Sequence, residues 1–124
     1  MIVLDTTVLI DVLRGLPAAL DYLQALDEPP TCSEVTRVEM LRGLRHRERD
    51  AGEALMRAIN WTTVDERIAR RAGSLGRTWR RSHALATTDL VIGATALELG
   101  ATLATANVRH FPMFPGLAPP YRPA

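Results

Sequence analysis

The segment from Asp89 to Leu99 limits the possible folds more than any other, because it is apolar on almost every side of a helix. Thr88 is placed to cap its beginning, and Gly100 is placed to end it. Residues 101–105 then have the pattern of a buried strand. A helix with so little polar surface must be covered on several sides, so we expect it to lie inside a layered domain.

Short strands and helices alternate along the rest of the chain. We predict strands at residues 1–4, 31–32 and 61–64. We predict helices at residues 6–15, 17–26, 33–44, 54–59 and 65–81. Thr6 or Thr7 could cap the first helix, and Ser33 the third, whose expected apolar residues are Val35, Val38, Leu41 and Leu44. The last helix is the most regular, with apolar residues at i, i+4, i+7 and i+11: Ile68, Ala72, Leu75 and Trp79. This alternation predicts an α/β fold with a mostly parallel sheet and helices on both faces, in which ligands bind beyond the carboxyl ends of the strands.

The composition is typical of one globular domain. The chain has 124 residues, of which 47% are hydrophobic and 23% charged, so we predict a single domain over residues 1–124. No run reaches the ~18 apolar residues of a membrane helix, and the single cysteine, Cys32, excludes an internal disulfide and a cysteine-based zinc site. We therefore expect a cytoplasmic protein that does not associate with membranes. The formal net charge of +1 means that any contact with nucleic acid is local.

Three acidic residues occupy positions that favour ligand binding, and each has a structural alternative. Asp5 ends the first predicted strand and Asp89 begins the most apolar helix, where either residue could instead cap a helix. Glu39 shares a helix face with the inward-facing Val35, and it could instead pair with Arg42 at i+3. None of the three residues identifies a site by itself.

The three carboxylates become informative if the α/β arrangement brings them into one crevice. Two carboxylates ~4 Å apart repel each other by about 4 kcal/mol at an effective dielectric constant of 20. A divalent cation relieves this repulsion, and ligands that are all oxygen favour Mg²⁺ or Mn²⁺ over Zn²⁺. A site of this kind supports phosphoryl transfer or phosphodiester hydrolysis.

Four segments carry motifs whose order and spacing are specific as a set. They are IVLDTTVLI at residues 2–10, SEVTRVEMLRG at 33–43, TDLVIGATA at 88–96 and LATANVRHF at 103–111. Together they span nearly the whole chain and resemble the PIN domain, and within it the bacterial VapC-type toxins of toxin–antitoxin pairs. The resemblance implies a PIN-like α/β/α sandwich and a metal-dependent endoribonuclease that hydrolyses RNA. It also implies a homodimer that a VapB-type antitoxin holds inactive.

The resemblance also implies roles for individual residues. The acidic residues of the family correspond to Asp5, Glu39 and Asp89, which we expect to hold Mg²⁺ or Mn²⁺, with Glu39 as a ligand or the general base. The fourth position of the family falls on Asn107, a neutral ligand or water-positioning amide, so the site has one negative charge fewer than the fully acidic pattern. In-line attack by water then leaves a 5′-phosphate and a 3′-hydroxyl. Two further positions match residues that place a hydroxyl near the site, Thr6 and Thr105.

Positive charge is concentrated in two places. Five arginines lie opposite the apolar stripe of the 65–81 helix: Arg67, Arg70, Arg71, Arg77 and Arg81. Three roles are open for these arginines: they bind RNA phosphates, they bind an acidic segment of an antitoxin, or they form only a solvated helix face. Arg109 and His110 lie nearer the expected crevice and are better placed to contact RNA.

Two rival interpretations remain open at this point. A receiver or phosphatase-like α/β domain also places an Asp at a strand end beside Mg²⁺, but here no second acid follows two residues after Asp5 and the chain has no lysine. A catalytically degenerate PIN domain would act only as a partner-binding module. Asn107 is the one residue that favours this alternative.

Overall fold

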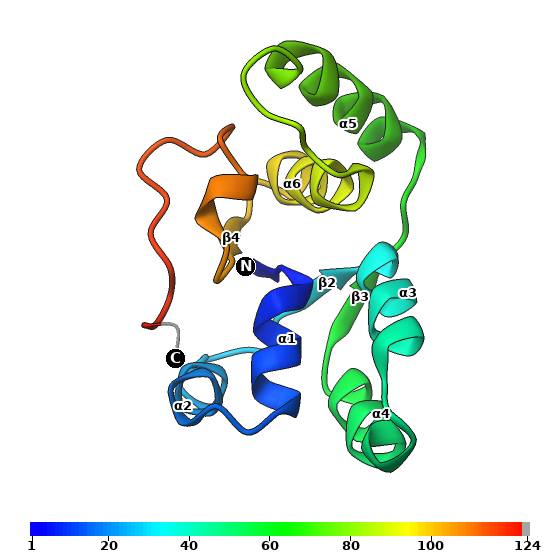
Figure 1. The fold of residues 1–124 in the computed structure, drawn as a ribbon, viewed down its shortest axis with the longest axis vertical. Helices are drawn as coiled ribbons and strands as arrows, with labels where there is room; N and C mark the ends of the chain where they lie inside the picture. The colour runs from blue at the N-terminus through cyan, green and yellow to red at the C-terminus, as the bar shows by residue number, and fades with distance from the viewer. Residues whose placement is uncertain (123–124) are drawn as a thin grey trace.

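The computed structural model describes residues 1–122, and in it helices and strands alternate as the sequence pattern predicts (Figure 1). The strands are β1 (Ile2–Leu4), β2 (Thr31–Ser33), β3 (Asn60–Thr62) and β4 (Thr102–Ala104). The helices are α1 (Thr6–Leu13), α2 (Pro17–Gln24), α3 (Glu34–Gly43), α4 (Arg49–Arg57), α5 (Glu66–Trp79) and α6 (Thr87–Leu99). Two short 3₁₀ turns are η1 (His46–Glu48) and η2 (Val108–His110).

The four strands form one parallel sheet in the order β3-β2-β1-β4. From β1 the chain builds outward in one direction through β2 to β3, and then returns to place β4 on the other side of β1, where Leu4 lies opposite Ala104. The strand order therefore reverses between β1 and β4. In parallel sheets a reversal of this kind opens a crevice beyond the carboxyl ends of the two strands, which is where ligands bind.

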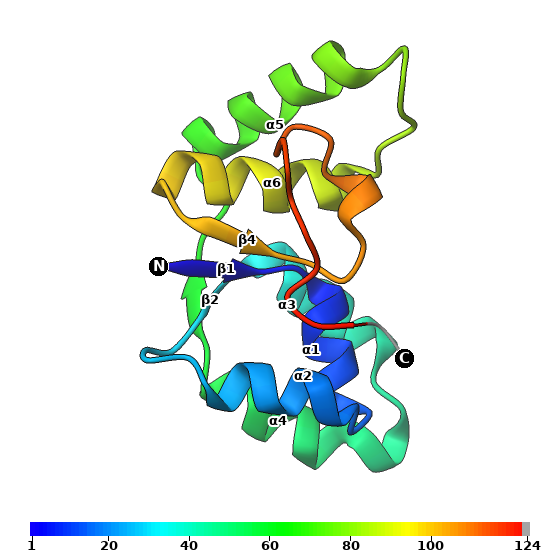
Figure 2. The ribbon, with the colours of Figure 1, turned by 90° about the vertical axis from the view of Figure 1, so that its left-hand side faces the viewer.

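Side chains alternate across the sheet and so divide the core into two parts. Val3 and Leu103 point to one face and pack against α6 through Ile92. Leu4 and Ala104 point to the other face, into a cluster that includes buried residues of α1, α3 and α4. Figure 2 shows the result as layers, with α5 and α6 on one side of the sheet and α1, α2 and α4 on the other. The predicted α/β/α sandwich is confirmed.

Helix α6 is covered on several sides, as its apolar composition requires. One side packs on the sheet, and Ala94 on another side packs with Ile68 and Ala72 of α5. Gly100 ends the helix in the left-handed conformation, with φ at +62°. Helix α6 begins at Thr87, so neither Thr88 nor Asp89 is its cap residue. Among the described residues, no helix has the length and apolar content to cross a lipid bilayer.

Helix α3 differs most from the expected pattern. Ser33 caps it as predicted, accepting a hydrogen bond from the backbone N–H of Val35 at 3.2 Å. The predicted apolar residues Val38 and Leu41, however, are 62% and 50% exposed, whereas Thr36 and Met40 are buried. The reason is that the inner side of α3 faces α1 and α6 close to the polar ends of the strands, where a threonine hydroxyl finds partners.

Candidate metal centre

Asp5 lies at the end of β1 in the crevice between β1 and β4, and its side chain is 3% exposed. It occupies the N-cap position of α1, but its carboxylate accepts no hydrogen bond from the backbone of that helix. Instead Oδ2 accepts from the hydroxyl of Thr105 at 2.7 Å and from the hydroxyl of Thr7 at 2.8 Å. Asp5 is thus the cap residue of α1 by position, as the structural alternative expects, but its side chain makes no capping hydrogen bond. Two hydroxyl donors from separate segments fix the direction of its carboxylate instead.

Thr7 and Thr105 also fix the backbone around the site. The Thr7 hydroxyl accepts from the backbone N–H of Ala106 at 3.3 Å, and the Thr105 hydroxyl accepts from that of Asn107 at 2.9 Å. Each threonine thus joins the carboxylate of Asp5 to the turn that follows β4. Thr105 was expected to orient a carboxylate, and this is confirmed. Thr7 was considered only as a helix cap, because nothing in the sequence indicates that its hydroxyl reaches a residue a hundred positions away.

Glu39 projects from the inner side of α3 and is partly buried. Its Oε1 accepts a hydrogen bond of 2.7 Å from the hydroxyl of Thr6, which also lies 3.0 Å from the hydroxyl of Thr36. No ion pair between Glu39 and Arg42 is present in the described part of the chain, so the structural alternative for Glu39 is not supported. A second hydroxyl from the start of α1 thus holds a second carboxylate of the crevice.

Asp89 lies in the first turn of α6 with its side chain 16% exposed. Its Oδ2 is 3.0 Å from Nδ1 of His110, whose side chain is 51% exposed. The amide nitrogen of Asn107 lies 3.1 and 3.2 Å from the two ring nitrogens of the same histidine. His110 was expected near the crevice because of its position, but its contact with Asp89 could not be inferred from spacing.

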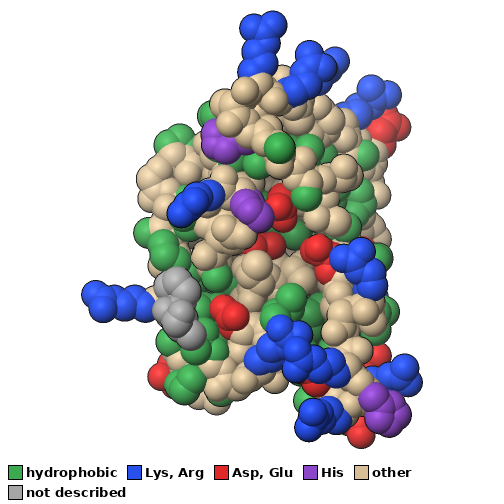
Figure 3. Space-filling view, in the orientation of Figure 1, with side chains coloured by type: hydrophobic (Ala, Val, Ile, Leu, Met, Phe, Trp, Pro, Cys, Tyr) green, Lys and Arg blue, Asp and Glu red, His purple; other side chains and the backbone are tan. Residues whose placement is uncertain are grey.

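The charges of the other two carboxylates act on Asp89. Burial raises the pKa of Asp89 above its ordinary value, the negative charges of Asp5 and Glu39 raise it further, and His110 lowers it. Asp89 is therefore close enough to Asp5 and Glu39 for their charges to oppose its ionisation. Figure 3 shows acidic side chains gathered in the middle of one face, beside a histidine and with arginines around them.

The chemistry of this donor set fits a hard divalent cation, because its ligands are carboxylate oxygens that repel one another. As the side chains stand, no group of three or more His, Cys, Asp or Glu residues within residues 1–122 is arranged to hold a metal ion. The present partners explain this, since Asp89 is turned onto His110 and Glu39 onto Thr6.

The cysteine and the arginine stripe lie outside this centre. Cys32 is fully buried, and burial raises the pKa of its thiol to about 12, so it packs as expected. Arg67 and Arg71 lie 3.3 Å from the two carboxylate oxygens of Glu98 on α6, and Arg70 pairs with Glu66 at 2.7 Å. The stripe is also shorter than predicted, because α5 ends at Trp79 and Arg81 lies beyond it. At least three of its members therefore hold α5 in place or pair along it.

Comparison with known proteins agrees with this geometry. The family model described as PIN domain matches residues 2–114. Ribonuclease VapC19 of Mycobacterium tuberculosis is 48% identical over 98% of this chain and 100% of its own length, and Ribonuclease VapC10 of the same organism is 43% identical over 98% and 93%. A toxin–antitoxin complex from Klebsiella pneumoniae contains a chain with a TM-score of 0.84 and 26% identity, covering 98% of this chain and 99% of that one. The chain therefore belongs to the PIN domain family, together with the VapC proteins.

Proposed function

We propose that this protein is a metal-dependent endoribonuclease and the toxin of a type II toxin–antitoxin pair. The observation that supports the proposal is that the charges of Asp5 and Glu39, which come from two other segments of the chain, both raise the pKa of Asp89, in a sheet whose strand order reverses between β1 and β4. The names of its relatives, ribonucleases VapC19 and VapC10, support RNA as the substrate. In the receiver-like alternative Asp5 would have to be phosphorylated, whereas here its Oδ2 is buried against two hydroxyls.

In this proposal Asp5 and Asp89 would be the principal ligands of Mg²⁺ or Mn²⁺, and Glu39 would be a further ligand or the general base. When bound, the cation neutralises negative charge on the scissile phosphate and makes water a better nucleophile. As general base, Glu39, held by Thr6, would take a proton from the attacking water as the oxygen of water forms its bond to phosphorus. The bond from phosphorus to the 3′ oxygen breaks in line with the attack, and this leaving oxygen takes a proton from solvent, which leaves a 5′-phosphate and a 3′-hydroxyl. Asn107 positions the attacking water or serves as a neutral ligand.

The direct test is cleavage of structured RNA by the purified protein with Mg²⁺ or Mn²⁺, compared with EDTA. Asp5→Asn and Asp89→Asn are expected to abolish cleavage while the protein remains folded. Asp21→Asn is the matched control, because Asp21 is an exposed carboxylate on α2, and its cleavage rate should equal that of the wild type. Equal rates in all four proteins would contradict the site. No cleavage by any of them, with tight binding of a partner, would favour the degenerate PIN module.

We further propose that the chain pairs with a VapB-type antitoxin and with a second copy of itself. The Klebsiella pneumoniae structure is a toxin–antitoxin complex, which supports the first partner. Val38 and Leu41, three residues apart on α3, expose large apolar side chains that a second copy would cover. Co-purification with the product of a neighbouring antitoxin gene tests the first partner, and light scattering of the isolated protein tests the second.

A further inference from the structure

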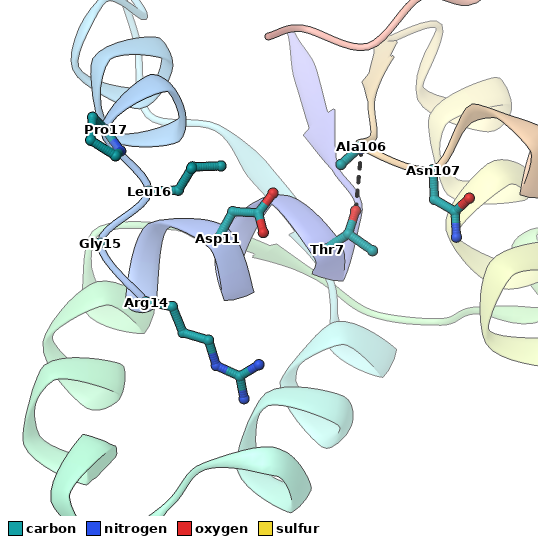
Figure 4. A pocket seen from close by; sticks show the side chains of 8 residues that line it. All are labelled: Thr7, Asp11, Arg14, Gly15, Leu16, Pro17, Ala106 and Asn107. Atoms are coloured by element: carbon teal, nitrogen blue, oxygen red, sulfur yellow. Dashed lines mark hydrogen bonds between the residues drawn. The ribbon is translucent and has the colours of Figure 1, made fainter. Parts of the chain in front are cut away.

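A hollow of about 720 Å³ adjoins the candidate metal centre (Figure 4). At one end it is lined by Thr7 and Asn107, which also belong to that centre. At the other end it is bounded by the turn between α1 and α2, with Leu16 and Pro17 as apolar lining. Its volume lies within the range of small-molecule sites, which is ~300 to 1,000 Å³. A molecule held in this hollow would therefore contact the same turn after β4 that binds Asp5.

The hollow contains one carboxylate, that of Asp11. Its Oδ2 accepts a hydrogen bond of 2.7 Å from the hydroxyl of Tyr121, which brings the C-terminal segment against α1. The ring of Tyr121 lies 6.0 Å from that of Tyr22, so the phenol is held from two sides. Within residues 1–122 the other oxygen, Oδ1, accepts no hydrogen bond. Asp11 thus has a fixed direction and one free acceptor.

Arg14 lies on the rim of the same hollow and supplies its positive charge. Its side chain is 48% exposed, and its nearest carboxylate is that of Glu48, with Nε 3.8 Å from Oε2. A contact of that length at an exposed position contributes little to stability, so the guanidinium can turn to another anion at little cost. A guanidinium binds the oxygens of a phosphate in pairs. Figure 4 shows Asp11 on α1 and Arg14 just beyond the end of that helix, both away from Asn107, with the Arg14 guanidinium directed away from the Asp11 carboxylate.

We propose that this hollow is a nucleotide subsite, which binds the RNA residue next to the scissile bond through Arg14 and Asp11. Arg14 binds the phosphate of that residue. Asp11 accepts a hydrogen bond from an amino group of its base, which rests on Leu16 and Pro17. A carboxylate repels phosphate and accepts from amino groups. Uracil has no amino group, and its single donor, N3–H, lies between two carbonyl oxygens that the carboxylate repels, so the subsite favours adenine, cytosine or guanine over uracil. The proposal rests on the nuclease function proposed above and adds a source of sequence preference.

Sequencing of the fragments cut from an RNA library randomised on both sides of the cleaved bond tests this assignment. We expect a preference against uracil at one flanking position, and Asp11→Asn should reduce it about tenfold or more, the contribution of a hydrogen bond to a charged group. The asparagine can still accept from Tyr121 but presents a donor to the base. Arg14→Gln should lower kcat/KM about tenfold at every sequence, whereas Arg57→Gln, an exposed arginine of α4, should change nothing. An unaltered pattern in Asp11→Asn together with a normal rate in Arg14→Gln overturns the proposal.

A second measurement keeps this test separate from the nuclease itself. Nucleoside 5′-monophosphates are titrated into the metal-free protein while NMR follows the backbone amides of Gly15, Leu16 and Ala106. AMP, CMP and GMP are expected to shift these signals more than UMP, and Arg14→Gln should weaken the effect. Such shifts without any RNA cleavage would contradict the nuclease function and keep the nucleotide site. RNA cleavage without any shift of these signals, and with an unaltered sequence preference in Asp11→Asn, would contradict the nucleotide site and keep the nuclease function. An Asp11→Asn protein that loses only antitoxin binding would lead to the same conclusion.

Discussion

Replacing Thr105 with valine removes one hydroxyl and leaves the shape of the side chain nearly unchanged. Thr105 is fully buried, donates to Oδ2 of Asp5 at 2.7 Å and accepts from the backbone N–H of Asn107 at 2.9 Å. The substitution therefore removes one of the two hydroxyl donors to the Asp5 carboxylate, a residue that is 3% exposed. It also leaves the backbone N–H of Asn107 without its partner.

The expected cost follows from these two losses. A hydrogen bond to a charged group contributes about 1.5 to 3 kcal/mol, and a donor left without a partner adds a further cost of about 1 kcal/mol when it is partly solvated. We expect Thr105→Val to lower the free energy of unfolding by about 2 to 4 kcal/mol, measured by urea denaturation in EDTA. The rate of RNA cleavage should fall with it, because Asp5 and Asn107 both lose their positions.

Thr95→Val is the matched control for this prediction. Thr95 is also fully buried, but its hydroxyl donates to the neutral carbonyl of Val91 in its own helix and not to a carboxylate. The same substitution should there cost about 1 kcal/mol or less and leave RNA cleavage intact. Equal stability losses in the two variants, with normal cleavage by Thr105→Val, would refute the argument that the hydroxyl network orients the site.

Three further predictions follow from single features of the structure. Asp89→Asn should raise the midpoint of thermal unfolding in EDTA at pH 7, because the fold raises the pKa of this carboxyl. Between the pKa of this carboxyl in the unfolded state and its higher pKa in the folded state, the native state binds more protons, so stability falls as pH rises through this range. The increase in the unfolding midpoint should vanish near pH 3, where the wild-type carboxyl is protonated in both states. Gly100→Ala should cost about 1 kcal/mol in urea denaturation, because the residue ends α6 at a φ of +62°. Leu41→Glu should convert the proposed dimer to a monomer in light scattering with no loss of helical circular dichroism, and an unchanged mass would place the interface elsewhere.

Much of the fold could be predicted because local signals and burial agree. The apolar segment around Ile92 requires burial on several sides, and it forms a helix enclosed between the sheet and α5. Asp5 follows a short apolar strand and so marks the carboxyl edge of the sheet. The same edge, together with the motifs, is the reason that the sequence predicts one site for Asp5, Glu39 and Asp89. The charges of Asp5 and Glu39 do act on Asp89, whereas the shared metal stays a prediction.

What could not be predicted depends on how the elements dock. Periodicity placed Val38 on the buried side of α3, but the angle at which this helix meets α1 and α6 turns Thr36 inward instead. The ion pairs of Glu98 with two arginines of α5, which reduce the positive charge of the basic stripe, could not be predicted either. The contact of His110 with Asp89 could not be predicted because it depends on the side-chain rotamers of two separate segments. Spacing along the sequence carries no information about such contacts.

The pairing of β1 with β4 has a consequence for when the protein becomes active. Ile2–Leu4 hydrogen-bond with Thr102–Ala104, and the Asp5 carboxylate depends on Thr105 for one of its two donors. During synthesis the first strand therefore gains this neighbour only after about a hundred further residues have been made, and a long-range closure of this kind slows folding. Until residues 102–105 have emerged from the ribosome, the Asp5 carboxylate lacks one of its two hydroxyl donors and the candidate site is incomplete.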